Sequence, residues 1–389
     1  MTTKTKTILW ATIILTTLSL AQAQTFTMLH TFTGSDGANP QSTLIQDAAG
    51  NFYGTTFYDG KSGYGTVFKI SPDRKVTVLY SFAGPPDAAN PAGPLLRDKS
   101  GNLYGTTVWG GASNQGAVFK LTSTGDETVL YSFAGYTADG SNPEGGVISD
   151  SDGNLFGTTE GGGDGAGCGG YIYGCGIIFE IDAAGHETIL HTFNGEGDGA
   201  IPWAGLIRDA AGHFYGTTVE GGTAGLGTIF KLDTAGTLTL LHSFAGADGA
   251  YPYGPVIRDA KGNLYGATYQ GGSSKVGTVF KLTTSGKLAV LHNFTGNTDG
   301  AYPPAGLVRD AAGNLYGATA QGGSSSNMGT VFKVDSSNKE TVLHSFTTPR
   351  QGMLPEAGLL LDKTGNLYGS TYYGGPRNDN DGTIFKLTP

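Results

Sequence analysis

Aromatic side chains beside three prolines are the residues best suited to contact a ligand. They are Trp203, Tyr251, Tyr253 and Tyr302. Three earlier segments of the same pattern carry asparagine beside the proline instead, at Asn39, Asn90 and Asn142. Aromatic rings with polar neighbours stack on sugars or anchor protein interfaces, so we predict a ligand-binding sector that also includes Trp109. The alternative is that these rings only cover seams between repeated units.

Catalytic residue sets are not found. The sequence contains no HExxH, GxSxG or Walker motif. Glycoside hydrolysis needs paired carboxylates at a defined separation, and the best candidates outside the recurring pattern are Glu144, Glu160 and Glu220. We therefore assign no catalytic residues and expect no cofactor.

Histidines and aspartates recur at fixed positions rather than in clusters. The histidines are His30, His191, His242, His292 and His344, with Tyr80 and Tyr131 at the same position elsewhere. The aspartates of the Asp-Gly links are Asp36, Asp139, Asp198, Asp248 and Asp299, and Asp87 stands in a variant link. A metal ion needs its ligands around one point, so we predict no metal site and assign the aspartates to turns. The stretch "NDNDG" at Asn378 echoes a calcium loop but lacks the closing glutamate.

The two cysteines lie in one irregular insertion, "GGGDGAGCGGYIYGCG". In an exported chain, such a pair predicts a disulfide between Cys168 and Cys175. A zinc site would need two more ligands, and none is nearby in the sequence.

A repeated phrase supplies the elements that must position these residues. "GNLYGTT" and its variants occur seven times, with the aromatic residue at Tyr53, Tyr104, Phe156, Tyr215, Tyr265, Tyr316 and Tyr368. The spacings are 51, 52, 59, 50, 51 and 52 residues, which indicates a repeat architecture. An aspartate opens the turn before each phrase, at Asp47, Asp98, Asp150, Asp209, Asp259, Asp310 and Asp362. We interpret it as hairpin chemistry.

Each repeat predicts four short antiparallel strands bounded by glycine, asparagine and aspartate. Seven such units predict an all-β fold, a seven-bladed β-propeller. The chain begins with an unpaired fourth strand, Thr25–Phe32, and ends with three strands in Leu359–Thr388. We expect the first strand to complete the last blade and close the ring, whereas a solenoid would need capping repeats. The long Gly-Gly loops and the Asp-Gly links would then share one face, the candidate binding face.

The N-terminus predicts export. Lys4 and Lys6 precede an apolar run from Ile8 to Leu20, and Ala21-Gln22-Ala23 resembles a signal peptidase site. We therefore predict a signal peptide at 1–23 and a single propeller domain at 24–389. No anchor follows the last strand, so a secreted or periplasmic protein without a membrane span is expected. The net charge of −9 argues against a nucleic-acid partner.

The wording "NLYGTT…GG…GTVFKL…VLHSF" resembles the Gloeobacter/Verrucomicrobia (GloVer) tandem repeat of "choice-of-anchor" proteins. The resemblance covers nearly the whole predicted mature chain and implies a bacterial exported protein. The kelch repeat is a weaker resemblance, through its period and its Gly-Gly pairs.

These features favour a non-enzymatic binding or scaffold propeller. Its partner would be a glycan, or a protein of the cell envelope or extracellular space. The alternative is a carbohydrate-active hydrolase or lyase on the same scaffold, because a propeller fold does not decide function. A third reading is a purely structural envelope protein.

Overall fold

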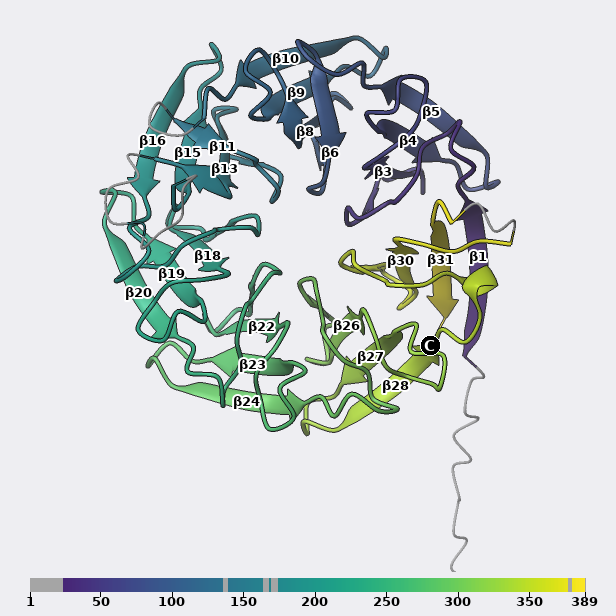
Figure 1. Ribbon diagram of the computed structural model, residues 1–389, viewed down its shortest axis with the longest axis vertical. Helices are drawn as coiled ribbons and strands as arrows, with labels where there is room; N and C mark the ends of the chain where they lie inside the picture. Colours follow the sequence, from purple (N-terminus) through teal and green to yellow (C-terminus); the bar gives the residue numbers. More distant parts are fainter. Residues whose placement is uncertain (1–23, 136–138, 164–167, 169–173, 377–379, 389) are drawn as a thin grey trace, which may run out of the picture.

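The computed structural model describes residues 24–135, 139–163, 168, 174–376 and 380–388. These residues form seven antiparallel sheets arranged as blades around a central axis (Figure 1). The predicted all-β, seven-bladed propeller is therefore confirmed. The signal peptide predicted at 1–23 and the first two residues of the "NDNDG" stretch lie outside the described residues.

The first four blades follow one another in chain order. Blade 1 consists of β2 (Ile45–Gln46), β3 (Phe52–Thr56), β4 (Thr66–Ile70) and β5 (Val76–Ser81). Blade 2 consists of β7 (Leu96–Arg97), β8 (Leu103–Gly110), β9 (Ala117–Leu121) and β10 (Glu127–Ser132), with β6 (Ala88–Pro91) added beside β8. Blade 3 consists of β12 (Ile148–Ser149), β13 (Leu155–Thr159), β15 (Ile177–Ile181) and β16 (Glu187–Thr192), and β11 (Gly140–Ser141) pairs with β14 (Gly161–Gly162) nearby. Blade 4 consists of β17 (Ile207–Arg208), β18 (Phe214–Thr218), β19 (Thr228–Leu232) and β20 (Leu238–Ser243).

The remaining blades continue the same order. Blade 5 consists of β21 (Ile257–Arg258), β22 (Leu264–Thr268), β23 (Thr278–Leu282) and β24 (Leu288–Asn293). Blade 6 consists of β25 (Val308–Arg309), β26 (Leu315–Thr319), β27 (Thr330–Val334) and β28 (Glu340–Ser345), followed by the 3₁₀ turn η1 (Pro349–Gln351). Blade 7 consists of β29 (Leu360–Leu361), β30 (Leu367–Thr371), β31 (Thr383–Thr388) and β1 (Thr25–Thr31).

The two ends of the described chain close the ring. β1 pairs antiparallel with β31, from Thr25 opposite Thr388 to Thr31 opposite Thr383. The sheet order β1-β31-β30-β29 makes blade 7 from both ends of the chain, as the unpaired first strand predicted. Closure leaves no blade with an open inter-blade face, which removes a route to edge-to-edge aggregation.

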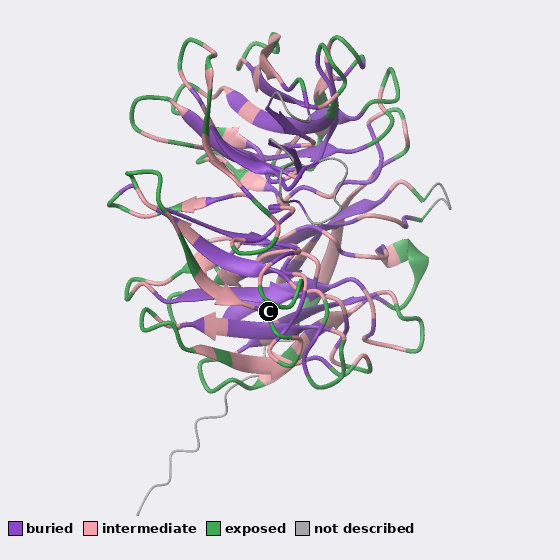
Figure 2. Ribbon diagram, turned by 60° about the vertical axis from the view of Figure 1, so that its left-hand side comes forward, coloured by how far each residue is buried: buried purple, intermediate pink, exposed green. Residues whose placement is uncertain are grey.

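The repeated phrase is explained by packing within and between blades. Tyr53 of β3 donates its hydroxyl to Asp47 at 3.0 Å, and Asp47 also accepts the backbone N–H of Asn51, which confirms the hairpin role of the aspartate. A Cβ at Gly54 would lie 2.7 Å from the ring of Phe68, so only glycine fits beneath that ring. Phe68 packs in turn against Phe32 of the preceding blade, with ring centroids 5.1 Å apart. The second and third strands of each blade are therefore mostly buried, as β3 and β4 are, whereas the fourth strands are only partly covered and the turns are the most exposed (Figure 2).

The recurring histidines lie on the fourth strands, at the outer rim (Figure 1). Four of them hydrogen-bond an aspartate of the following link, as His191 does with Asp198 at 2.8 Å. Tyr80 and Tyr131 make the same contact, to Asp87 and Asp139. These aspartates also accept backbone N–H groups of the link, which agrees with their predicted turn role.

Candidate functional site

A cavity of about 710 Å³ lies at the centre of the ring and is lined by residues from all seven blades. Its wall contains small residues where neighbouring links approach one another closely. A Cβ at Gly145, for example, would lie 2.3 Å from the backbone nitrogen of Gly205, and one at Gly254 would lie 2.2 Å from that of Gly306. The wall is therefore built largely of backbone, and its chemistry comes from the larger side chains of each link.

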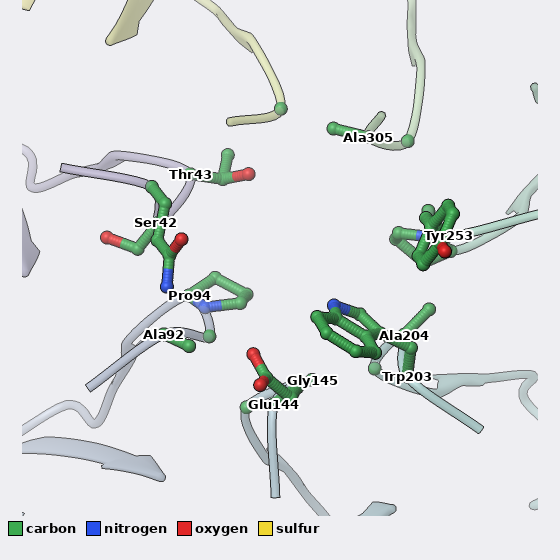
Figure 3. A pocket seen from close by; sticks show the side chains of 18 of the residues that line it. Ser42, Thr43, Ala92, Pro94, Glu144, Gly145, Trp203, Ala204, Tyr253 and Ala305 are labelled. Atoms are coloured by element: carbon green, nitrogen blue, oxygen red, sulfur yellow. The ribbon is translucent and has the colours of Figure 1, made fainter. Parts of the chain in front are cut away.

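Each link between two blades contains one equivalent proline, which we call the link proline: Pro40, Pro91, Pro143, Pro202, Pro252, Pro303 or Pro355. The larger side chains belong to the residue that directly follows it. Around the ring they are Gln41, Ala92, Glu144, Trp203, Tyr253, Pro304 and Glu356, and all seven line the cavity. Figure 3 shows the indole of Trp203 and the carboxyl group of Glu144 directed toward the same open space, with Tyr253 beside them. The cavity is asymmetric because this single position carries six different residue types around the ring.

Each link is held on both sides, which fixes the direction of the residue after its proline. The N–H of Ile201 donates to the carbonyl of Cys175 in blade 3 at 2.9 Å, and its carbonyl accepts the N–H of Val219 in blade 4 at 2.9 Å. The same pair of bonds recurs at Tyr251, with Leu226 and Tyr269. Trp203 and Tyr253 follow these clamped residues, so their positions are set before any ligand arrives.

The residue before the proline has a different role. It adopts φ between 53° and 60° in all seven links, at Asn39, Asn90, Asn142, Ile201, Tyr251, Tyr302 and Leu354. Asparagine tolerates this left-handed conformation best, and the amide groups of the three asparagines donate to carbonyls of the preceding blade at 2.8–3.0 Å. Tyr251 and Tyr302 take this seam position, and neither is among the residues that line the cavity.

The aromatic residues form a continuous chain of ring contacts. Trp203 and Tyr253 meet edge to face with centroids 5.5 Å apart, and Tyr253 meets Tyr269 at 5.2 Å. Tyr269 then contacts Tyr302, with ring centroids 5.1 Å apart. Tyr302, at the seam between two blades, therefore packs against the aromatic residues that line the cavity. Trp109 lines another part of the cavity and is 41% exposed, which leaves its ring open to solvent.

The carboxyl groups of the cavity favour protonation. Burial, with a smaller contribution from the charge of Glu160, raises the pKa of Glu144 to about 8. Burial raises the pKa of Glu356 to about 7 and also raises that of Glu160. Of these three, Glu144 and Glu356 line the cavity. At neutral pH the Glu144 carboxyl group is therefore mainly a neutral hydrogen-bond donor and acceptor.

The predicted disulfide is present and joins Cys168 to Cys175. Both cysteines are buried, in a hydrophobic cluster with Phe193 and Ala200. Because the carbonyl of Cys175 accepts the N–H of Ile201, the disulfide is attached to the link that carries Trp203.

Sequence reasoning missed Tyr269, Tyr372 and Glu356, which all line the cavity. Tyr269 and Tyr372 directly follow the repeated phrase, where the other blades carry Phe57, Val108, Glu160, Val219 and Ala320. Glu356 stands after the last link proline, Pro355. Aligning the seven links on their prolines would have grouped Glu356 with Trp203.

The fold and cavity together define a seven-bladed propeller with an aromatic and acidic central site. The chain belongs to the Gloeobacter/Verrucomicrobia repeat family, whose model matches residues 15–173 and 165–385. A search of curated protein sequences finds no significant match.

Several solved structures have a similar fold. One is virginiamycin B lyase from Staphylococcus aureus, with a TM-score of 0.60 and 14% identity, covering 94% of this chain and 99% of that one. Another is the extracellular domain of a putative one-component system from B. thetaiotaomicron, with a TM-score of 0.54 and 10% identity, covering 89% of this chain and 38% of that one. A third is a putative 6-phosphogluconolactonase from Bacteroides uniformis, with a TM-score of 0.50 and 16% identity, covering 79% of this chain and 84% of that one. Identities this low show a shared fold and nothing about shared chemistry.

Two further observations concern the part of the chain that the structure describes. Within it, no helix has the length and apolar character required to cross a bilayer. No group of three or more His, Cys, Asp or Glu side chains within it is arranged to hold a metal ion.

Proposed function

We propose that this chain is an exported, non-enzymatic binding propeller whose ligand is a glycan held in the central cavity. The observation that carries the proposal is the pair of neighbouring rings, Trp203 and Tyr253, at two of the seven positions that line the cavity. Flat apolar rings beside hydroxyl and carboxyl groups suit the alternating apolar faces and polar edges of sugars.

The shape of the site favours a glycan over a protein partner. A concave cavity of about 710 Å³ accepts a small molecule or the end of a chain, in the size range of ordinary ligand pockets. Tyr58 and Trp109 line the same cavity and remain 39% and 41% exposed, so a longer glycan would have further rings to contact.

Export is part of the proposal and rests on the sequence of residues 1–23. The resemblance of the repeat wording to that of exported "choice-of-anchor" proteins supports it. N-terminal sequencing of protein recovered from the periplasm or the medium should give Gln24 as the first residue. Retention of residues 1–23 in that protein would contradict the proposed cleavage.

The experiment is a glycan-array screen of residues 24–389, followed by calorimetry with the best ligand. Trp203→Ala should weaken binding by about 1–3 kcal/mol while the protein stays folded. Tyr64→Ala is the matched control, because Tyr64 is 39% exposed and does not line the cavity. Absence of glycan binding, or equal losses in both variants, would contradict the proposal. A loss of stability of about 3–5 kcal/mol on Trp203→Ala would instead indicate a core residue.

One observation favours a second candidate, a carbohydrate-active enzyme. Glu144 combines a pKa raised to about 8 with a place in the cavity and a second carboxyl group, Glu160, close enough to influence it. A protonated acid beside another carboxyl group is the arrangement of glycosidases. Mass spectrometry of a bound oligosaccharide after long incubation separates the candidates. Cleavage by the native chain that Glu144→Gln abolishes would favour the enzyme, and an intact ligand would favour the binding protein.

A further inference from the structure

The titratable side chains that line the cavity are all acidic. Glu144 and Glu356 project into it from blades 3 and 7, and Glu160 lies close enough to Glu144 to raise its pKa. None of the described residues that line the cavity is lysine, arginine or histidine. An anionic ligand would therefore enter without a partner for its charge, which is costly in an enclosed site.

The remaining large side chains are electron-rich rings. Trp203, Tyr253, Tyr269 and Tyr372 line the cavity, and the first three touch in sequence. The faces of tryptophan and tyrosine attract cations within about 6 Å of the ring. The carboxyl groups and these rings act on one another. Burial, and after it the charge of Glu356, raises the pKa of Tyr269. Burial raises the pKa of Tyr372, with smaller contributions from Tyr58, Tyr373 and Glu356.

From this combination we infer that the ligand carries a positive charge, as a glycan with a free, unacetylated amino group does. The inference rests on the proposed function and narrows its ligand class. An ammonium group would lie against the ring of Trp203 and near the carboxyl group of Glu144. A second positive charge would lie near Glu356, beside Tyr269 and Tyr372. The rest of the sugar would contact the backbone wall of the cavity.

Binding of such a group is coupled to proton release. Glu144, with a pKa near 8, and Glu356, with a pKa near 7, are both largely or partly protonated at pH 7. A bound cation favours their ionised forms and lowers both pKa values. Protons therefore leave when the cation binds, and the affinity for a permanently charged ligand rises between pH 6 and pH 8. The other titratable groups near this site include Tyr58, Glu160, Glu220, Tyr253, Tyr269 and Tyr372. The raised pKa values of Tyr253, Tyr269 and Tyr372 keep those three side chains neutral over that range.

The first experiment compares two oligosaccharides of equal length, a glucosamine tetramer and its fully N-acetylated form, by calorimetry at pH 6.5. The free-amine form should bind at least about tenfold more tightly. Glu144→Gln and Glu356→Gln should each reduce this preference. Glu196→Gln, on an exposed loop, should not, which separates recognition in the cavity from general attraction to a chain of net charge −9.

The outcomes distinguish the inference from the function on which it rests. Equal binding of the two tetramers, or preference for the acetylated one, overturns the charge inference but leaves glycan binding intact. The same holds if neither tetramer binds while other glycans on the array do. If no glycan binds at all, both proposals fail. A preference that Glu196→Gln reduces as much as Glu144→Gln does also overturns the inference.

A second experiment tests the charge alone. Choline and its uncharged isostere, 3,3-dimethyl-1-butanol, have nearly the same shape, so they differ at the cavity mainly in charge. Choline should bind more tightly than the alcohol, and its affinity should rise about threefold or more from pH 6 to pH 8. Its binding should also release protons, which is measured by comparing the binding enthalpy in buffers of different ionisation enthalpy. An affinity for choline that is flat over this range, with no proton release, would overturn the coupling.

Discussion

Replacing Glu144 by glutamine should make the stability of the propeller less sensitive to alkaline pH. The folded chain raises the pKa of this carboxyl group from 4.5 to about 8, which means that its charged form is disfavoured by folding. The sign follows from linkage: below pH 4.5 the group is neutral in both states, and as pH rises toward 8 only the unfolded state ionises freely. Native stability therefore falls over this interval, and glutamine, which never ionises, removes that loss.

The gain in the free energy of unfolding depends on how far the pKa of Glu144 is raised and on how open the cavity is to water. At 1.36 kcal/mol for each pH unit, a change from 4.5 to about 8 corresponds to at most about 5 kcal/mol above pH 8. Glu144 is only half-buried and faces a cavity that water can enter, so solvent screening reduces this upper bound. We expect Glu144→Gln to gain about 1–2 kcal/mol at pH 9, or about 1–3 °C in Tm for a chain of this size, and only about a fifth of that at pH 5.

The assay is thermal unfolding by calorimetry at pH 5, 7 and 9, with Glu196→Gln as the control. Glu196 lies on an exposed loop, so its replacement should shift Tm equally at all three values. Glu356 titrates over the same range in the native chain and in the Glu144→Gln variant, so its contribution to the difference in Tm between them cancels. The reasoning is refuted if Glu144→Gln gives the same Tm difference at pH 5 and pH 9, or if it destabilises the chain at pH 9.

Three further predictions concern the scaffold. Deleting residues 25–32 should lower the Tm of the whole ring by about 10 °C or more, because β31 loses its partner and blade 7 its outer strand; an unchanged Tm would contradict closure. Tyr251→Asn should leave Tm within about 2 °C and glycan affinity unchanged, since asparagine takes φ 57° readily; a loss of affinity would assign Tyr251 to the site. His344 has no carboxylate partner, and burial lowers its pKa to about 4. Gln351 accepts the N–H of Thr347, as the link aspartates accept N–H groups in other links, so Gln351→Asp should give His344 a carboxylate partner. This variant should raise Tm at pH 5 and not at pH 8, and equal shifts at both values would argue against an ion pair with His344.

The fold was predictable because residues with the same structural role recur in each of the seven repeats. The turn aspartate, the glycine beneath the phenylalanine ring and the buried strand pattern each recur with one spacing. Closure was predictable from the unpaired Thr25–Phe32 strand, since four-stranded blades leave it no other partner. The disulfide followed from two cysteines in one insertion.

The site was predictable only in part, because the two residues that flank a link proline serve different surfaces. The sequence places Tyr251 and Tyr253 side by side around Pro252, and they look equivalent there. The left-handed φ of Tyr251 and the fixed φ of proline turn the two side chains apart, one to the seam and one to the cavity. The approach of Glu160 to Glu144 and the contact of Tyr269 with Tyr253 depend on how adjacent segments pack, which spacing alone does not specify.

The residue after each link proline can vary with the ligand while the backbone of the propeller stays the same. The buried phenylalanine that packs between neighbouring blades is the same residue all around the ring, at Phe32, Phe82, Phe133, Phe193, Phe244, Phe294 and Phe346. At the axis these side chains after the link prolines face the cavity, and alanine at Ala92, proline at Pro304 and tryptophan at Trp203 are all compatible with the same backbone. The variable side chains on clamped links therefore make a cavity whose charge and shape differ from blade to blade while the backbone stays the same. A ligand should thus be recognised through departures from the repeat. Here those departures are rings on blades 4 and 5 and acids on blades 3 and 7, which line one cavity.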